Sequence, residues 1–256
     1  MGQPVTIHRN LTLNFIIIIL LLSSAIFLTM ALASQSAIKS LSGKIIDQTI
    51  DKTERRMAQF FNPVTTEILR LRMLNDKGQL DRLPQEDILK LSMSIMQYHP
   101  QISSIMLADE TGTEQMVQKK KRGWVYRRTV PGQPTRYIRY DSQGKQTSEK
   151  QFFQDYDPTT RPWFINAHRK WDDADETLRS GPASDLITWT EPYQFHSSKR
   201  LGTSISIPYL SGDGKMHVIG LDILFQSIQS WVNNLKVLNN GQVMILTTDE
   251  NPRVLV

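Results

Sequence analysis

The stretch DYDPTTRPWF, residues 155–164, places two prolines, an arginine and a tryptophan within ten positions. A proline disfavours the helical conformation in the residue before it, so Asp157 and Arg161 are expected to be extended. Pro162 suits the first position of a helix. We therefore expect a helix that begins at Pro162, with Arg161 directly before its first turn, where free backbone N–H groups attract an anion.

The side chains around this helix start predict a binding site for a small molecule. Arg161 can hold a carboxylate through two parallel hydrogen bonds, and the rings of Tyr156 and Trp163 can wall the site and face a cation. A structural interpretation stays open beside this one. In it, Arg161 pairs with Asp222 or with strand carbonyls, and Trp163 belongs to the core.

The composition of the chain excludes several chemistries. The sequence has 256 residues, a formal net charge of +5 and no cysteine, which excludes a disulfide scaffold, a cysteine-based zinc site and a thiol nucleophile. Its five histidines include no pair at metal-ligand spacing on one helix. No nucleophile elbow, phosphate-binding loop or zinc-protease motif is present. We expect no metal, no cofactor and no catalysis in this portion.

Residues 11–33, LTLNFIIIILLLSSAIFLTMALA, lie in a segment without charge between Arg9 and Lys39. This run is long enough to cross a hydrocarbon core of about 30 Å as a helix. A cleaved signal peptide is the alternative, since ALAS at 31–34 resembles a cleavage site. The apolar run exceeds the usual ~7–15 residues of a signal peptide, which favours an uncleaved transmembrane helix behind a short N-terminus, residues 1–10.

Residues 34–76 continue as an amphipathic pattern, with apolar residues at steps of three and four and charges on the other face. The pattern predicts one long helix, which Pro63 should kink or interrupt and Gly78 should end. The apolar stripe includes Ile38, Leu41, Ile45, Met57, Phe61, Val64 and Ile68. It could pack on its own domain or join two copies, and we expect a parallel homodimer through residues 38–70.

The remaining sequence predicts an α+β domain. A helix is expected in residues 83–100, and strands are expected in residues 102–117, 123–130, 135–141, 201–210 and 216–225. Residues 227–240 read as a connecting helix. Ile245-Leu246 followed by Asp249-Glu250 repeats the earlier Ile105-Met106 and Asp109-Glu110. Residues 241–256 are therefore expected to begin a second, truncated module.

Basic and aromatic residues interleave in KKKRGWVYRR, residues 119–128. Lysines and arginines on phosphates, with Trp124 or Tyr126 stacked on bases, would form a nucleic-acid surface. Lysines at an exposed strand edge also prevent pairing between edges. We favour the strand edge and expect no nucleic-acid partner.

The apolar span, the long helix, YDPTTRPWF, EPY at 191–193 and GLDI at 220–223 together resemble the double Cache, or PAS-like, sensor domain of bacterial transmembrane receptors. The resemblance implies a membrane-distal ligand-binding module in residues 77–226, in an inner-membrane protein whose bulk lies in the periplasm. It implies a small-molecule sensor, with an amino acid-like compound or an organic acid as its ligand, and an output domain outside this sequence.

The amino-acid-binding members of that family imply a ligand site formed by Tyr156, Arg161, Trp163, Phe164, Tyr193, Phe195 and Asp222. Arg161 would hold a carboxylate and Asp222 an ammonium group. Phe164 stands where the family has a tyrosine, and Phe195 where it has an aspartate. With one carboxylate left for an ammonium group, we expect weak or no binding of ordinary α-amino acids. A carboxylate without an amine fits as well.

A different class of function also stays open. Paired carboxylates such as Glu191 and Asp222 could serve an anchored or secreted hydrolase. Finding both carboxylates in one cleft, away from Arg161, would favour that alternative.

Overall fold

The computed structural model describes residues 5–76, 79–212 and 214–234. Its α-helices are α1 (Val5–Asp76), α2 (Gln85–Tyr98), α3 (Pro162–Asp172), α4 (Glu176–Ser180) and α5 (Phe225–Asn233), with short 3-10 turns at Leu80–Arg82, Pro158–Thr160 and Ala183–Leu186. Its strands are β1 (Ile102–Asp109), β2 (Glu114–Lys120), β3 (Gly123–Thr129), β4 (Thr135–Tyr140), β5 (Gln146–Phe152), β6 (Thr188–Trp189), β7 (Tyr193–Gln194), β8 (Leu201–Leu210) and β9 (Met216–Leu224). The α+β prediction is confirmed.

Helix α1 crosses the boundary between two compact units, Met1–Arg55 and Arg56–Val256. The first unit consists of helical turns whose apolar side chains, from Leu11 to Leu32, are exposed. Among the described residues, this is the one helix long and apolar enough to cross a membrane. The two helices predicted for residues 11–33 and 34–76 are continuous.

Pro63 lies inside α1, and the helix continues through it. The prediction that Pro63 could interrupt the helix is therefore wrong. Gln101 Nε2 donates to the Phe60 carbonyl at 3.2 Å, and the neighbouring Val64 and Ile68 are fully buried. Packing of these turns in the second unit therefore holds the helix together across the missing N–H group. Gly78 and residues 241–256, predicted to end the helix and to begin a second module, lie outside the described residues.

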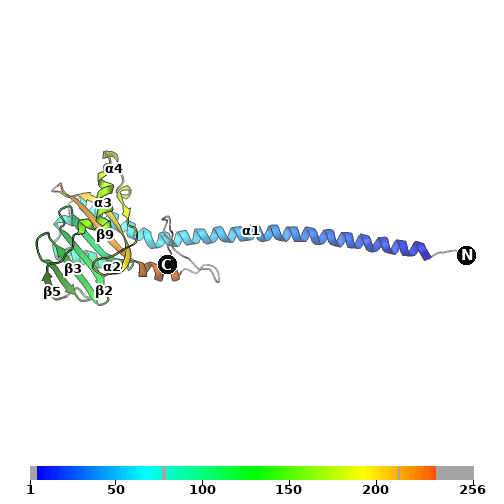
Figure 1. Ribbon diagram of the computed structural model, residues 1–256, viewed down its shortest axis with the longest axis horizontal. Coiled ribbons are helices and arrows are strands. Elements are labelled where there is room, and N and C mark those ends of the chain that lie inside the picture. The colour runs from blue at the N-terminus through cyan, green and yellow to red at the C-terminus, as the bar shows by residue number, and fades with distance from the viewer. Residues whose placement is uncertain (1–4, 77–78, 213, 235–256) are drawn as a thin grey trace. The chain divides into compact units, whose positions relative to one another are not determined.

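The strands form one antiparallel sheet in the order β5-β4-β3-β2-β1-β9-β8-β6, and the short β7 also pairs with β8 (Figure 1). Neighbours β1 and β9 are far apart in sequence, and their register places Ser104 opposite Asp222 and Ile105 opposite Leu221. Side chains alternate between the two faces of each strand. The pairing therefore gives the sheet one apolar face and one mixed face.

The apolar face carries the main core. Ile105, Val117 and Leu221 pack there with buried residues of α2 and with Val64 and Ile68 of α1. The predicted stripe of α1 is therefore divided. Its C-terminal part is covered by its own domain, whereas Ile38 and Leu41 are 62% and 61% exposed.

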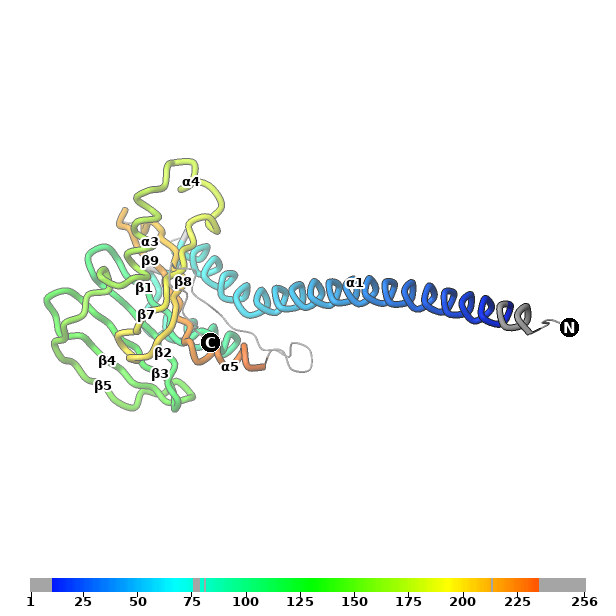
Figure 2. Tube along the Cα trace, turned by 45° about the vertical axis from the view of Figure 1, so that its right-hand side comes forward, coloured from blue at the N-terminus to red at the C-terminus, as the bar shows by residue number. Residues whose placement is uncertain are grey.

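The mixed face is covered by α3 and the loops around it, within residues 153–200, and α3 contacts β8 and β9 (Figure 2). Here Met106, Met116 and Val218 form a second, smaller core with Trp163, Phe164 and Ala167 of α3. Helix α3 begins at Pro162, as predicted, because Arg161 is extended (φ −88°, ψ 144°) and the proline occupies the first helical position. The candidate site lies on this face, beside the smaller core.

Candidate functional site

Four polar side chains form one row across the mixed face. The register places Gln118 of β2 opposite Ser104 of β1, Ser104 opposite Asp222 of β9, and Asp222 opposite Ser204 of β8. All four are buried. Buried polar groups need hydrogen-bond partners, and here neighbouring members of the row supply them.

Asp222 is the charged member of this row. Ser204 Oγ donates to Asp222 Oδ1 at 2.5 Å, and the Tyr193 hydroxyl lies 2.7 Å from Ser204 Oγ. Burial raises the pKa of Asp222 to about 7, although hydrogen bonds from Ser204 and Ser104 act in the opposite direction. Asp222 can therefore exchange a proton near neutral pH.

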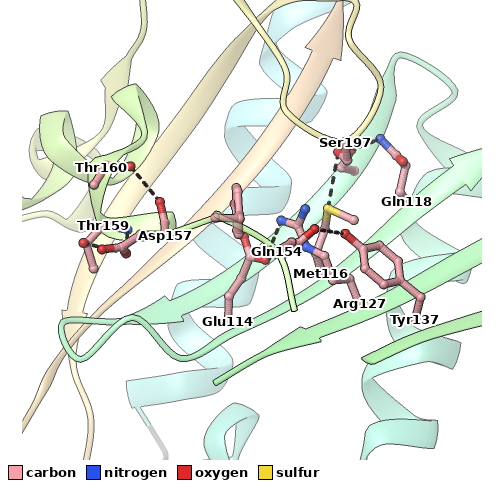
Figure 3. A network of polar contacts seen from close by, with 12 residues as sticks. Glu114, Met116, Gln118, Arg127, Tyr137, Gln154, Asp157, Thr159, Thr160 and Ser197 are labelled. Carbon is pink, nitrogen blue, oxygen red and sulfur yellow. Dashed lines mark hydrogen bonds and ion pairs between the residues drawn. The ribbon is translucent and has the colours of Figure 1, made fainter. Parts of the chain in front are cut away.

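A second polar group on the same face is the ion pair between Glu114 of β2 and Arg127 of β3. Arg127 donates from Nε at 2.9 Å and from Nη2 at 2.5 Å, both to Glu114 Oε2, and the two side chains are 1% and 0% exposed (Figure 3). Burial alone would lower the pKa of Arg127, but the Glu114 carboxylate outweighs it and holds this pKa above its ordinary value. Arg127 therefore stays charged.

Tyr156 completes this ion pair. Its hydroxyl donates to Glu114 Oε1 at 2.7 Å, and its ring lies 4.0 Å from Arg127 Cζ, within cation–π distance. Burial, followed by the charge of Glu114, raises the pKa of Tyr156 well above its ordinary value. Tyr156 of the predicted motif therefore contacts Glu114 of β2 and Arg127 of β3, two charged residues that lie outside the motif.

Arg161 is half-buried, lies directly before α3, and donates a hydrogen bond to a backbone carbonyl of this chain. Its Nη2 donates to the Gln194 carbonyl at 3.0 Å, and its guanidinium lies 5.6 Å from the centre of the Tyr193 ring. Within the described residues no ion pair joins Arg161 to Asp222. Arg161 thus makes the strand-carbonyl contact of the structural interpretation, and a ligand carboxylate would have to replace or share that contact.

Trp163, Phe164 and Phe195 are buried apolar residues. A methyl group on Gly220 would lie 2.8 Å from Trp163 Cε3, so the indole packs directly on the β9 backbone. The Phe195 ring packs against Tyr193 at 5.0 Å between centroids and fills the space above Gly202. An aspartate at position 195 would be buried there, so the phenylalanine is part of the packing of this loop.

A cavity of about 280 Å³ opens beside the polar row, over β2 to β5. It is lined by Met116, Gln118, Lys120, Val125, Tyr137, Arg139, Ser148, Lys150, Phe152, His196 and Ser197. None of the seven predicted site residues lines it. Tyr156, Tyr193 and Asp222 lie in the polar network next to it, Arg161 lies at the start of α3, and the other three are packed in the core.

Sequence reasoning missed Glu114, Arg127 and the cavity. No alternation of buried and exposed positions marks the pair, because β2 and β3 are buried on both faces along most of their length. Glu191, proposed with Asp222 for a hydrolase, is exposed whereas Asp222 is buried. In the described part of the chain no group of three or more His, Asp or Glu side chains could hold a metal ion.

Comparison with known proteins gives a partial sequence match. No protein-family model matches the chain. The methyl-accepting chemotaxis protein McpC of Bacillus subtilis is 29% identical over 100 residues, which are 39% of this chain and 13% of that protein. The chain therefore spans far less than the length of this curated relative.

Solved structures with a similar arrangement have low identity. The ligand-binding domain of the Pseudomonas aeruginosa amino acid chemoreceptor PctB, in complex with L-Gln, gives a TM-score of 0.44 at 16% identity and covers 74% of this chain and 58% of its own. The ligand-binding domain of the Campylobacter jejuni chemoreceptor Tlp3, in complex with L-valine, gives a TM-score of 0.46 at 17% identity. The match covers 76% of this chain and 65% of the Tlp3 chain. The proteins to which this chain is similar are chemoreceptors and their ligand-binding domains.

Proposed function

We propose that this chain is the extracytoplasmic sensor region of a transmembrane signal-transduction receptor, and that it binds a small anionic or zwitterionic metabolite. The ligand binds on the mixed face of the sheet, under residues 153–200. The similarity to a methyl-accepting chemotaxis protein supports the sensor role. The output domain lies outside this sequence, and no catalysis is assigned to this portion.

The observation that carries the proposal is the polar character of a buried sheet face. A face that served packing alone would be apolar, like the opposite face with Ile105 and Leu221. Instead it holds Glu114, Arg127 and Asp222, all nearly or fully buried. Burying charges is costly, and a concave region with a few convergent polar groups of perturbed pKa is typical of a ligand site.

In the proposed arrangement α1 anchors the domain in the inner membrane, with residues 1–10 in the cytoplasm and the sheet in the periplasm. Two copies associate in parallel along the exposed part of the stripe. Only a ligand that binds two arrangements of the pair with different affinity can shift them, so the signal consists of a change in helix pairing.

The first prediction concerns Arg161 and a ligand. A compound at ten times its dissociation constant should stabilise the chain by about 1.4 kcal/mol. A panel of amino acids and organic acids, screened by thermal unfolding of the chain in lipid nanodiscs, should contain such a compound. Arg161→Ala should abolish the stabilisation, because the ligand carboxylate loses its guanidinium.

Arg169→Ala is the matched control, since Arg169 is an exposed arginine of the same helix. It should leave the stabilisation intact. Equal stabilisation of the wild-type protein and of Arg161→Ala would remove Arg161 as the ligand anchor. An Arg161→Ala variant that no longer folds would instead show that the bond to the Gln194 carbonyl is structural.

The second prediction concerns the pairing of α1. Single cysteines placed at residues 38–57 should crosslink between copies in membranes at steps of three and four residues, because apolar side chains such as Ile38, Leu41 and Ile50 are exposed among the described residues. Cysteines at Val64 or Ile68 should not crosslink, since these side chains are fully buried in the core. Crosslinking without helical periodicity would contradict the parallel pair.

A further inference from the structure

Three cations line the cavity over β2 to β5, and its lining includes no carboxylate from the described part of the chain. Lys120, Arg139 and Lys150 come from β2, β4 and β5 and belong to its lining. The register explains why they share one face, because Arg139 is opposite Ser148 and Tyr137 is opposite Lys150. Both partners of each pair line the cavity.

Carboxylates of the described residues do not neutralise the charges of this cavity. Within the described residues no carboxylate oxygen lies within ion-pair distance of Lys120, Arg139 or Lys150. On the other face of the same two strands, Arg136 Nε lies 2.6 Å from Glu149 Oε1. In β5, Glu149 therefore points to the face opposite the cavity, whereas Lys150 lines the cavity.

The pKa of Lys120 responds to this local excess of positive charge. Burial lowers it, and the charges of Arg139 and Arg127 lower it further. A bound anion would act in the opposite direction on all three cations.

Unpaired buried groups lie in and behind the wall of the cavity. Arg127 Nη1, Gln154 Nε2 and His196 Nδ1 are buried and have no hydrogen-bond partner among the residues that the structure describes. Arg127 lies between Met116 and Tyr137, which line the cavity, and Gln154 accepts a hydrogen bond from the Tyr137 hydroxyl (Figure 3). An unsatisfied buried donor is destabilising, so the wall behind the cavity has more donors than acceptors.

The size and the remaining lining restrict the ligand further. A volume of about 280 Å³ lies at the lower end of the range for small-molecule pockets. Met116 and Val125 supply apolar surface, and the rings of Tyr137 and Phe152 stack 5.1 Å apart. These dimensions and surfaces fit a short carbon skeleton with charged groups.

We propose that this cavity, the cationic pocket, binds a small organic anion with at least two negative charges. The charged groups of the anion lie among Lys120, Arg139 and Lys150, which line the cavity from β2, β4 and β5. The proposal rests on the sensor function proposed above and gives it a ligand class and a site separate from Arg161.

The test is calorimetry on the chain in lipid nanodiscs, with succinate, tricarballylate and glycerol 3-phosphate as the probes. Acetate and L-glutamine serve as ligands with one carboxylate. A multiply charged probe should bind, and both Arg139→Gln and Lys150→Gln should weaken it at least tenfold. Lys145→Gln, which removes the same charge from an exposed turn outside the cavity, should change the affinity less than twofold. Comparing succinate and tricarballylate with glycerol 3-phosphate shows whether the pocket prefers carboxylate or phosphate groups.

Binding by none of the three multiply charged probes would overturn the inference, as would binding that Arg139→Gln and Lys150→Gln leave unchanged. The sensor proposal is tested separately through Arg161. L-glutamine binding that is lost only in Arg161→Ala would keep the proposed function and remove the cationic pocket. Dianion binding that is lost in the pocket variants and kept in Arg161→Ala would support the pocket and remove Arg161 as the anchor.

Discussion

Replacing Glu114 with alanine should lower the free energy of unfolding by about 3–5 kcal/mol, because Arg127 would remain charged and buried without its partner. Both hydrogen bonds that Arg127 donates go to one oxygen of Glu114, and Tyr156 donates to the other. The substitution therefore leaves the buried Arg127 and the half-buried Tyr156 without this acceptor. Urea unfolding of the chain in detergent, followed by circular dichroism, measures the change.

The double variant Glu114→Leu, Arg127→Met separates the cost of an unpaired charge from the value of the pair. It removes both charges and keeps apolar volume, so it should be considerably more stable than Glu114→Ala. Glu149→Ala is the control, since it breaks the exposed pair with Arg136 and should cost much less. If the double variant were as unstable as the single one, the cost would come from packing.

The second large effect concerns Asp222 and pH. Its pKa is about 7 in the folded protein, against an ordinary value of 3.8 for an aspartate. Below pH 3.8 the carboxyl group of Asp222 is protonated in both the folded and the unfolded protein, and its neutral form contributes its full stabilisation. As pH rises towards 7 the unfolded chain ionises first, so the free energy of unfolding falls. The loss is complete above the folded pKa and reaches about 4 kcal/mol at most.

Asp222→Asn should remove this slope. The amide oxygen still accepts a hydrogen bond from Ser204, so the variant should match the wild-type protein near pH 4 and exceed its stability near pH 8. Glu114 and Arg127 also act on the pKa of Asp222, and both are unchanged in the variant. Urea unfolding at several pH values measures the slopes. Glu191→Gln, an exposed carboxylate, should keep the wild-type slope, and equal slopes in all three proteins would contradict the raised pKa.

The elements that the sequence predicts well have strong local signals. Pro162 defines the start of α3, and the alternating strands around the turn at residues 131–132 form the expected hairpin of β3 and β4. Strand β5 was not predicted, because most of its side chains are exposed and polar and its pattern carries no apolar alternation. It forms by pairing with β4, which is a tertiary contact.

The site was less predictable than the fold. The motif residues Arg161 and Trp163 were found, but the sequence could not tell that the indole packs on Gly220 or that the guanidinium binds the Gln194 carbonyl. The pairing of Glu114 with Arg127 depends on the register between β2 and β3 and on burial from both sides. Neither follows from the spacing of residues along the chain.

Adjacent residues of the central strands face the two different sides of the sheet. Ser104 and Gln118 face the polar side, and their chain neighbours Ile105 and Val117 hold the buried turns of α1. A strand cannot twist on one side alone. Substitutions selected for altered ligand affinity on the polar side are therefore expected to change how firmly the helix is held on the other. If the proposed sensor function holds, sensitivity to the ligand and the stiffness of α1 will evolve together.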